Sequence, residues 1–418
     1  MALSMFTLAF IVFLLSDIAM RLWLASRQLR HVHRHRAAVP AEFSDRISLH
    51  SHQRAADYTT AKMKVSMVER VIEAVVLVAF TLLGGLQALD VQLGNLIDNE
   101  MLRQLCLIGV VMALLGVVGL PFSIWKKFKL EARFGFNRMT PLLFMLDAFK
   151  TLVLSLVLGT PLVASILWIM GNAGPYWVLW AWGIWVAFNL LVLWLLPTVI
   201  APLFNKFTPL DNPEMAERIH ALAQRCGFSL GGLFVMDGSK RSAHGNAYFT
   251  GFGKARRIVF FDTLLSRLNI DEIEAVLAHE LGHFKHRHII KRMLISFSLA
   301  LAFLLLLGWL STQVWFYVDL GVVPQLGRPN DALALILFFL AMPVFTFWAT
   351  PLASWMSRRD EFQADRYAAS VASSNHLISA LVKLYDDNAA TLTPDPVHSA
   401  FYDSHPPAVL RIQQLKHG

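Results

Sequence analysis

The chain has 418 residues, of which 56% are hydrophobic and only 16% are charged, and its mean hydropathy is +0.51. This balance excludes a soluble globular protein of this size and predicts a mainly α-helical protein that crosses a membrane several times. The net charge of +8 is better explained by membrane topology than by nucleic-acid binding, and the 2 cysteines exclude a disulfide framework.

Seven stretches are long and apolar enough to span a membrane. They cover about residues 5–25, 71–89, 105–124, 151–170, 176–201, 293–311 and 332–356. The first is not a signal peptide, because no basic residue precedes it and its apolar run is too long. It contains Asp17 and Arg21, four residues apart. Either this pair faces the interior of the helix bundle, or Arg21 snorkels from the helix end.

Basic residues alternate with the spans. Nearly all of the 37 Lys and Arg residues fall in residues 26–70, 125–150, 202–292 and 357–418. Basic loops remain on the cytosolic side, so we expect the N-terminus outside and the C-terminus in the cytosol. The chain then divides into 1–201 with spans one to five, the cytosolic segment 202–292, 293–356 with spans six and seven, and the cytosolic part 357–418.

The segment 202–292 is the polar region that is large enough to fold as an α+β unit. A helix is expected over 213–225, between Asn212 and Gly227. Short strands are expected at 233–236, 247–250 and 258–261, and two further helices near 375–388 and 407–416. A helix that begins after Asn269 runs almost directly into span six.

The helix after Asn269 carries the motif His279–His283, which reads His-Glu-Leu-Gly-His. Two histidines four residues apart project from one helical face, one turn above the other, and can bind one Zn²⁺ ion together. Glu280 lies beside them and can act on a zinc-activated water as general base. Asn269 and Glu272 can form a capping box, so the motif lies well inside the helix.

A catalytic zinc site needs a third protein ligand. Position 286 is His and position 289 is Ile, so the extended three-histidine motif is absent. We expect Glu361 to supply the ligand, at the start of a helix where span seven leaves the membrane. Asp365, one turn further, could accept the free N–H of a ligand histidine. The alternative is an ordinary solvated acidic face beside neighbouring arginines.

Three other histidines are less specific. His286 could compete for the metal, but His286 and His288 more often cap or solvate a helix end. His405 stands before two prolines, and a lone histidine is more often structural than catalytic. A rigid Pro-Pro corner could nevertheless hold His405 at a site.

Several motifs in order make the chain resemble the type I CAAX prenyl proteases, which are integral-membrane zinc endopeptidases. The resemblance covers nearly the whole chain. It rests on Phe134–Asn137, Leu203–Phe207, His244–Phe249, His279–His283, Glu361–Asp365 and Ser404–Pro407 with Arg411.

The resemblance implies a role for each site residue. It implies one zinc ion held by His279, His283 and Glu361, with Glu280 as the base and with Asp365 and Arg411 in support of the ligands. It further implies that Asn246 and His405 stabilise the tetrahedral intermediate. Substrate would lie along an edge strand formed by Ala247, Tyr248 and Phe249.

The family also implies seven helices around a water-filled chamber, with the zinc site at its cytosolic end. The polar loop is shorter than in eukaryotic members, and no endoplasmic-reticulum retrieval signal ends the chain. These departures favour a bacterial cytoplasmic membrane, where prenylated substrates need not exist.

We therefore expect a membrane-embedded zinc metalloendopeptidase that cleaves near the C-terminus of prenylated or related membrane-associated peptides. Its expected partners are the peptide substrate and membrane lipid, and not nucleic acid. One alternative is a quality-control zinc protease of the HtpX type, although such chains are shorter with fewer spans. An intramembrane protease would place its histidines inside an apolar span. A non-catalytic transporter or scaffold would lack some candidate ligands.

Overall fold

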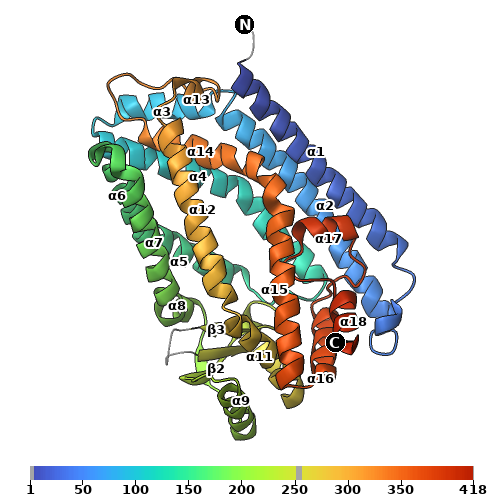
Figure 1. Cartoon of the computed structure of the whole chain (residues 1–418). Helices are drawn as coiled ribbons and strands as arrows, with labels where there is room; N and C mark the ends of the chain where they lie inside the picture. The colour runs from blue at the N-terminus through green and yellow to red at the C-terminus, as the bar shows by residue number, and fades with distance from the viewer. Residues whose placement is uncertain (1–3, 251–256, 418) are drawn as a thin grey trace.

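The structure consists of a group of long helices and a smaller mixed α/β part at one end of them (Figure 1). The computed structural model describes residues 4–250 and 257–417. The long helices and their short companions are α1 Met5–Arg34, α2 Leu49–Phe80, α3 Gly85–Leu96, α4 Glu100–Trp125, α5 Pro141–Leu154, α6 Thr160–Asn172, α7 Trp177–Leu195, α8 Ala201–Phe204, α12 His288–Leu310, α13 Val314–Val318, α14 Asp331–Thr346 and α15 Thr350–Val371. The mixed part contains β1 Phe207–Pro209, α9 Pro213–Arg225, β2 Gly232–Met236, β3 Ala247–Thr250, β4 Arg257–Phe261, α10 Asp262–Leu265, α11 Ile270–Lys285, α16 Ser374–Asp387, α17 Pro396–Tyr402 and α18 Ala408–His417.

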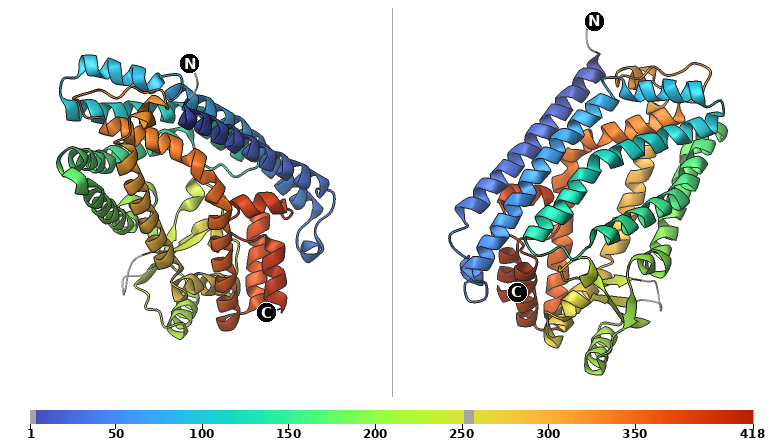
Figure 2. Two further views of the ribbon diagram at one scale, coloured as in Figure 1. Left: turned by 45° about the horizontal axis from the view of Figure 1, so that its top comes forward. Right: turned by 180° about the vertical axis from the view of Figure 1, so that it is seen from behind.

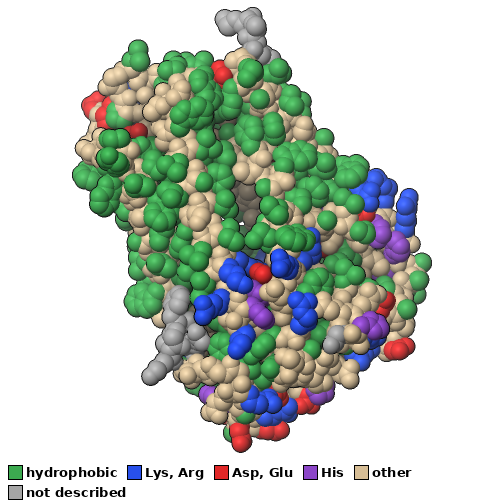
Figure 3. Space-filling model, in the orientation of Figure 1, with side chains coloured by type: hydrophobic (Ala, Val, Ile, Leu, Met, Phe, Trp, Pro, Cys, Tyr) green, Lys and Arg blue, Asp and Glu red, His purple; other side chains and the backbone are tan. Residues whose placement is uncertain are grey.

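The helices confirm a polytopic membrane protein. Within residues 4–250 and 257–417, 6 helical runs are long and apolar enough to cross a membrane, or up to 7 if the bent pair α2 and α3 counts as one span. The runs contain expected spans one, three, four, five and seven, and expected span six, 293–311, overlaps His288–Leu310 except for its last residue. Hydrophobic side chains cover the part of the surface in Figure 3 that these helices form, whereas charged side chains gather over the mixed part. The polar part therefore lies at one membrane surface.

The expected second span, residues 71–89, is wrong in its boundaries. The helix α2 ends at Phe80, and α3 leaves it at an angle of 52°. Gly84 takes a left-handed φ of 74° at this break, a conformation that costs a glycine little. Apolar composition continues through the turn, so hydropathy alone gives no sign of the change in direction.

The expected last span also differs in shape. A 3-10 turn over Phe347–Ala349 separates α14 from α15, and Pro351 lies in the first turn of α15, where its missing N–H costs nothing. From there α15 runs on to Val371. Glu361 was expected to start a helix, but it lies in the middle of α15.

The Asp17 and Arg21 pair faces a neighbouring helix. Arg21 Nε donates a hydrogen bond of 2.8 Å to Asp17 Oδ1, and the guanidinium lies 4.1 Å from the centre of the Phe347 ring. Asp17 is buried. The pair therefore packs inside the bundle, which excludes simple snorkelling of Arg21. Figure 2 shows the same helix α1 running beside α2, which it contacts.

The sheet has the order β1-β2-β4-β3. The central strands β2 and β4 run parallel, and β1 and β3 pair with them antiparallel at the two edges. Expected strands 233–236, 247–250 and 258–261 correspond to β2, β3 and β4, whereas β1 was not expected. Central β4 buries Ile258, Val259 and Phe260, as expected of a strand covered on both faces.

One hydrophobic core joins the two polar segments of the chain. Ile219 of α9, Phe260 of β4 and Leu277 of α11 lie in the same buried cluster as Leu381 of α16 and Ile412 of α18. A second cluster lies among the membrane helices. The shared core brings residues 357–418 against the helix that carries the two histidines.

Candidate metal centre

The first half of the site lies on α11. Its N-terminus forms the expected capping box, in which Asn269 Oδ1 accepts from the Glu272 N–H and the Glu272 side chain accepts from the Asn269 N–H. This cap begins the helix two turns or more before the motif, so His279 and His283 lie on a regular helical face. Their Nε2 atoms are 3.3 Å apart. The two rings therefore point at the same place.

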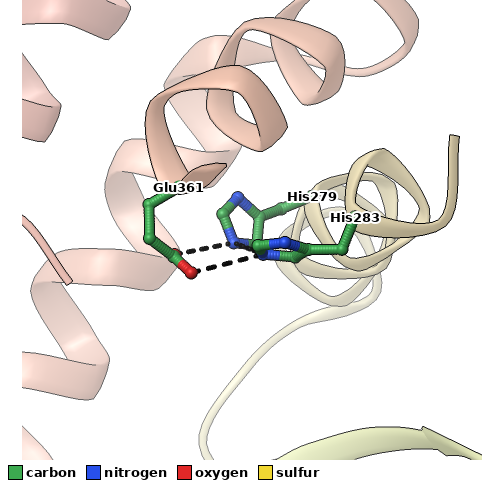
Figure 4. A group of neighbouring side chains, drawn as sticks. All are labelled: His279, His283 and Glu361. Atoms are coloured by element: carbon green, nitrogen blue, oxygen red, sulfur yellow. Dashed lines mark hydrogen bonds and ion pairs between the residues drawn. The ribbon is translucent and has the colours of Figure 1, made fainter. Parts of the chain in front are cut away.

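The second half comes from α15, which packs against α11. Glu361 Oε2 lies 3.3 Å from His279 Nε2, and Glu361 Oε1 lies 3.4 Å from His283 Nε2 (Figure 4). One donor atom from each of these three residues lies within 4.8 Å of the others. Glu361 is buried, with 3% of its surface exposed, so the ordinary solvated acidic face is excluded.

A glycine allows this close approach of the two helices. A Cβ on Gly282 would lie 2.9 Å from the Cα of Ala364, which is shorter than real Cβ contacts allow. Any larger residue at position 282 would push α15 away. Since Glu361 and Ala364 lie on the same helix, the glycine determines how near the carboxylate comes to the histidines.

The donor atoms themselves fit a metal ion. Glu361 Oε2 is buried and has no hydrogen-bond partner among the described residues. In a neutral imidazole whose Nδ1 carries the proton, Nε2 presents a lone pair. Three lone pairs then face one another, an arrangement that costs free energy unless a cation lies between them. Two imidazole nitrogens and one carboxylate are a donor set typical of catalytic zinc.

His279 is supported on its other nitrogen. Its Nδ1 lies 2.8 Å from Asp365 Oδ1, and Asp365 in turn accepts two hydrogen bonds from Arg411, of 2.6 and 2.8 Å. Asp365 and Arg411 are both buried. A carboxylate in this position holds the proton on Nδ1 and turns Nε2 toward the site.

The pKa values of the two histidines agree with their surroundings. Burial lowers the pKa of His283 to about 4, which keeps its ring neutral at physiological pH. Burial alone would also lower the pKa of His279, but the carboxylates of Asp365 and Glu361 raise it. The two carboxylates around His279 therefore stabilise a positive charge next to them.

Glu280 and His405 complete the surroundings of the three candidate ligands. Burial raises the pKa of Glu280 above its ordinary value of 4.5. His405 stands before the Pro-Pro corner with an exposed side chain, and its Nε2 comes within 3.5 Å of Glu361 Oε1. The structure thus brings together His405 and the three candidate ligands, although they come from two separate helices and a turn.

The residues expected to line the substrate lie at the edge of the sheet. Asn246 is exposed and precedes β3, and its Oδ1 accepts from the Ala247 N–H at 2.9 Å. Ala247, Tyr248 and Phe249 belong to β3, the last strand in the sheet order. An edge strand has one row of backbone groups available for pairing with an extended peptide.

Sequence reasoning missed one residue near the site. His288 was expected to cap or solvate a helix end, but only 1% of its surface is exposed and its Nδ1 lies 2.9 Å from His283 Nδ1. His286, in contrast, lies at the C-cap of α11 and is only partly buried. A histidine shortly after a metal-binding helix is the one signal that the sequence offered.

The chain is similar to known proteins over nearly its whole length. Residues 28–206 match the family described as CAAX prenyl protease N-terminal, five membrane helices, and residues 209–418 match Peptidase family M48. A CAAX prenyl protease 1 homolog of Oryza sativa subsp. japonica is 37% identical over 332 residues, which cover 76% of this chain and 74% of that protein. CAAX prenyl protease 1 of Saccharomyces cerevisiae is 32% identical over 400 residues, which cover 90% and 88%.

A solved structure has the same fold. The crystal structure of S. mikatae Ste24p superimposes with a TM-score of 0.92 at 29% identity, and the match covers 99% of this chain and 100% of that one. These relatives are eukaryotic, so the comparisons do not support the bacterial source that the short polar loop and the chain end had suggested.

Proposed function

The chain belongs to the CAAX prenyl protease 1 family of M48 peptidases and is a multi-pass membrane metalloprotease, and from this premise we propose that it uses zinc to cleave near the C-terminus of prenylated substrates. We propose His279, His283 and Glu361 as the zinc ligands. The observation that carries this proposal is the convergence of their three donor atoms, one of them a buried carboxylate oxygen that has no hydrogen-bond partner within residues 4–250 and 257–417.

When bound, a zinc ion would polarise the scissile carbonyl and lower the pKa of a water molecule. Residues of the chain orient the reactants and transfer the proton. The pKa of Glu280 is raised toward neutral pH; its carboxylate takes a proton from water and returns it to the leaving amine. Asp365 holds His279 in the tautomer whose Nε2 faces the site.

Two residues are proposed to meet the negative charge that develops on the substrate oxygen. His405 stands beside Glu361 on an exposed turn, a position from which a ring N–H can donate to substrate. Asn246 offers an exposed amide next to the edge strand β3. Hydrogen-bond donors that are already in place stabilise an oxyanion without reorganisation at the moment of reaction.

We propose that substrate adds to β3 as an extended strand, with Ala247, Tyr248 and Phe249 along it. The site also lies on the cytosolic side in this proposal. The support is the concentration of Lys and Arg residues in the segments at this end of the helices. A cytosolic site at the membrane surface suits a peptide whose lipid chain lies in the bilayer.

The activity test uses purified full-length protein and a farnesylated peptide that ends in a CAAX sequence. We expect about one zinc ion per chain, cleavage that a chelator abolishes and added zinc restores, and no turnover in Glu280→Gln with zinc still bound. Full activity in Glu280→Gln would refute its role as base. Absence of stoichiometric zinc would instead support a non-catalytic scaffold or transporter.

The lipid requirement needs a separate comparison. The same peptide is offered with and without its farnesyl group, each with and without chelator. We expect the farnesylated peptide to be cleaved faster. Equal cleavage of both peptides would leave the metalloprotease assignment intact and would remove the preference for prenylated substrates.

A further inference from the structure

We propose that His288 is a positioning residue for the metal centre: it holds His283 in the tautomer and orientation that point Nε2 at the metal. This inference rests on the proposed zinc site and adds to it a support that neither the motif nor the matched families assign. The observation behind it is the contact of 2.9 Å between Nδ1 of His283 and Nδ1 of His288.

The hydrogen-bond geometry leaves one consistent arrangement of protons. Nε2 of His283 faces Glu361 and the ring of His279, so as a ligand it must offer a lone pair. Its proton is then on Nδ1, which donates to Nδ1 of His288. His288 must in turn carry its proton on Nε2, and that atom lies 2.9 Å from Gln363 Oε1, an acceptor.

Burial makes this arrangement costly to break. His288 is 1% exposed, so water does not replace a lost partner, and an unpaired buried polar group costs the full desolvation penalty. The carboxylate of Asp360 is also near, with Oδ1 3.6 Å from His288 Nε2. Both neighbours of Nε2 are acceptors, and both favour the tautomer in which Nδ1 of His288 accepts from His283.

The backbone explains how His288 reaches its position. Arg287 takes a left-handed φ of 56°, so the chain turns sharply between the end of α11 and the start of α12. This turn lets the first residue of α12 come back to a histidine of the preceding helix. Gln363 belongs to α15, close to Glu361. His288 therefore links the helix that supplies His283 with the helix that supplies the carboxylate ligand.

The two ligand histidines are supported differently. His279 contacts a carboxylate directly, that of Asp365 in its pair with Arg411, whereas the direct partner of His283 is the imidazole of His288. The Gln363 amide and the Asp360 carboxylate lie one step further out, at Nε2 of His288.

The test compares substitutions that keep or remove the acceptor at the place of Nδ1. In His288→Asn the amide oxygen can occupy about that place, whereas His288→Gln puts its polar atoms nearer to Nε2, and His288→Ala removes both. His286→Ala is the matched control, a histidine of the same turn that has no hydrogen bond to His283 among the described contacts. The readout is zinc affinity of purified full-length protein, measured by competition with a chelating dye.

We expect His288→Ala and His288→Gln to bind zinc about 10- to 100-fold more weakly than the wild type, the usual loss on removing such a partner. His288→Asn should retain most of the affinity, and His286→Ala should match the wild type. The visible spectrum of the Co²⁺-loaded proteins should change in the same order, because it reports ligand geometry. If His288→Ala does not fold, the Asn and Gln variants decide the question.

The inference is overturned if His288→Ala binds zinc as tightly as the wild type, or if Asn and Gln at 288 weaken binding equally. The second result would point to packing alone. Both outcomes leave the proposed function standing when the wild type binds one zinc ion. A wild-type protein without stoichiometric zinc would overturn the proposed function, and this inference with it.

Discussion

The Cα of Ala364 lies 2.9 Å from the place that a Cβ on Gly282 would occupy. This contact joins the helix of the two histidines to the helix of Glu361. Gly282, a residue of the motif without a functional side chain, is therefore the one that brings the third candidate ligand into reach.

Gly282→Ala should separate α11 from α15 by several tenths of an ångström or more. We expect overpacking to cost about 1–3 kcal/mol of unfolding free energy. Zinc affinity and activity should fall as well, since a displacement of about 1 Å in a catalytic group can cost about 10²-fold in rate. Thermal unfolding and zinc titration of the purified variant measure both effects.

Gly183→Ala in α7 is the matched control. A Cβ at Gly183 meets nothing within 4 Å, so an alanine there should leave stability unchanged or raise it slightly. Equal behaviour of the two variants would contradict the proposed role of the close helix approach.

The pH dependence of cleavage should report the ionisation of the Glu280 carboxyl. Burial raises the pKa of this carboxyl above 4.5, and only the ionised form accepts a proton. Activity should therefore be present above that raised pKa and be lost as the pH falls through it. The measurement is kcat/KM against pH, with zinc content followed over the same range to exclude metal loss. An acid limb at or below pH 4.5 would contradict the assignment.

Asp365→Asn should damage both stability and metal binding. It leaves Arg411 buried without its counter-charge, and breaking a buried pair costs about 3–5 kcal/mol. It also weakens the acceptor for His279 Nδ1, so zinc affinity should drop about 10- to 100-fold. Chemical denaturation and zinc competition report the two losses.

Asp271→Asn offers a comparison on the same helix. Asp271 pairs with Arg218 at the surface in the first turn of α11, and an exposed pair contributes about 0–1 kcal/mol. If both substitutions lower the free energy of unfolding equally, the buried pair of Asp365 and Arg411 contributes no more to stability than the surface pair.

The far end of the helices contains a second buried ion pair. Arg103 of α4 and Asp90 of α3 are both nearly inaccessible, and Gln325 also donates to Asp90. Asp90→Asn should destabilise the protein by about 3–5 kcal/mol, whereas Glu100→Gln, at the more exposed partner of Arg103, should cost about 0–1 kcal/mol. Zinc affinity should be unchanged in both, because α3 and α11 lie at opposite ends of the molecule (Figure 1). Loss of zinc in either variant would show that the two ends are coupled.

The sequence alone determined the features that depend on residues close together in the chain. The cap at Asn269, the common face of His279 and His283 and the helix over 213–225 follow from local geometry and hydrogen bonding. The apolar runs likewise predicted most of the membrane helices, because a minimum apolar length is needed to cross the bilayer.

Only the tertiary structure decided how these pieces meet. The break after Phe80, the burial of His288 and the place of Glu361 inside α15 depend on contacts between residues far apart in the chain. Residue type does not distinguish a histidine that caps a helix in water from one held against a ligand. That difference arises when α11 and α15 pack through Gly282 and exclude water from the groups between them.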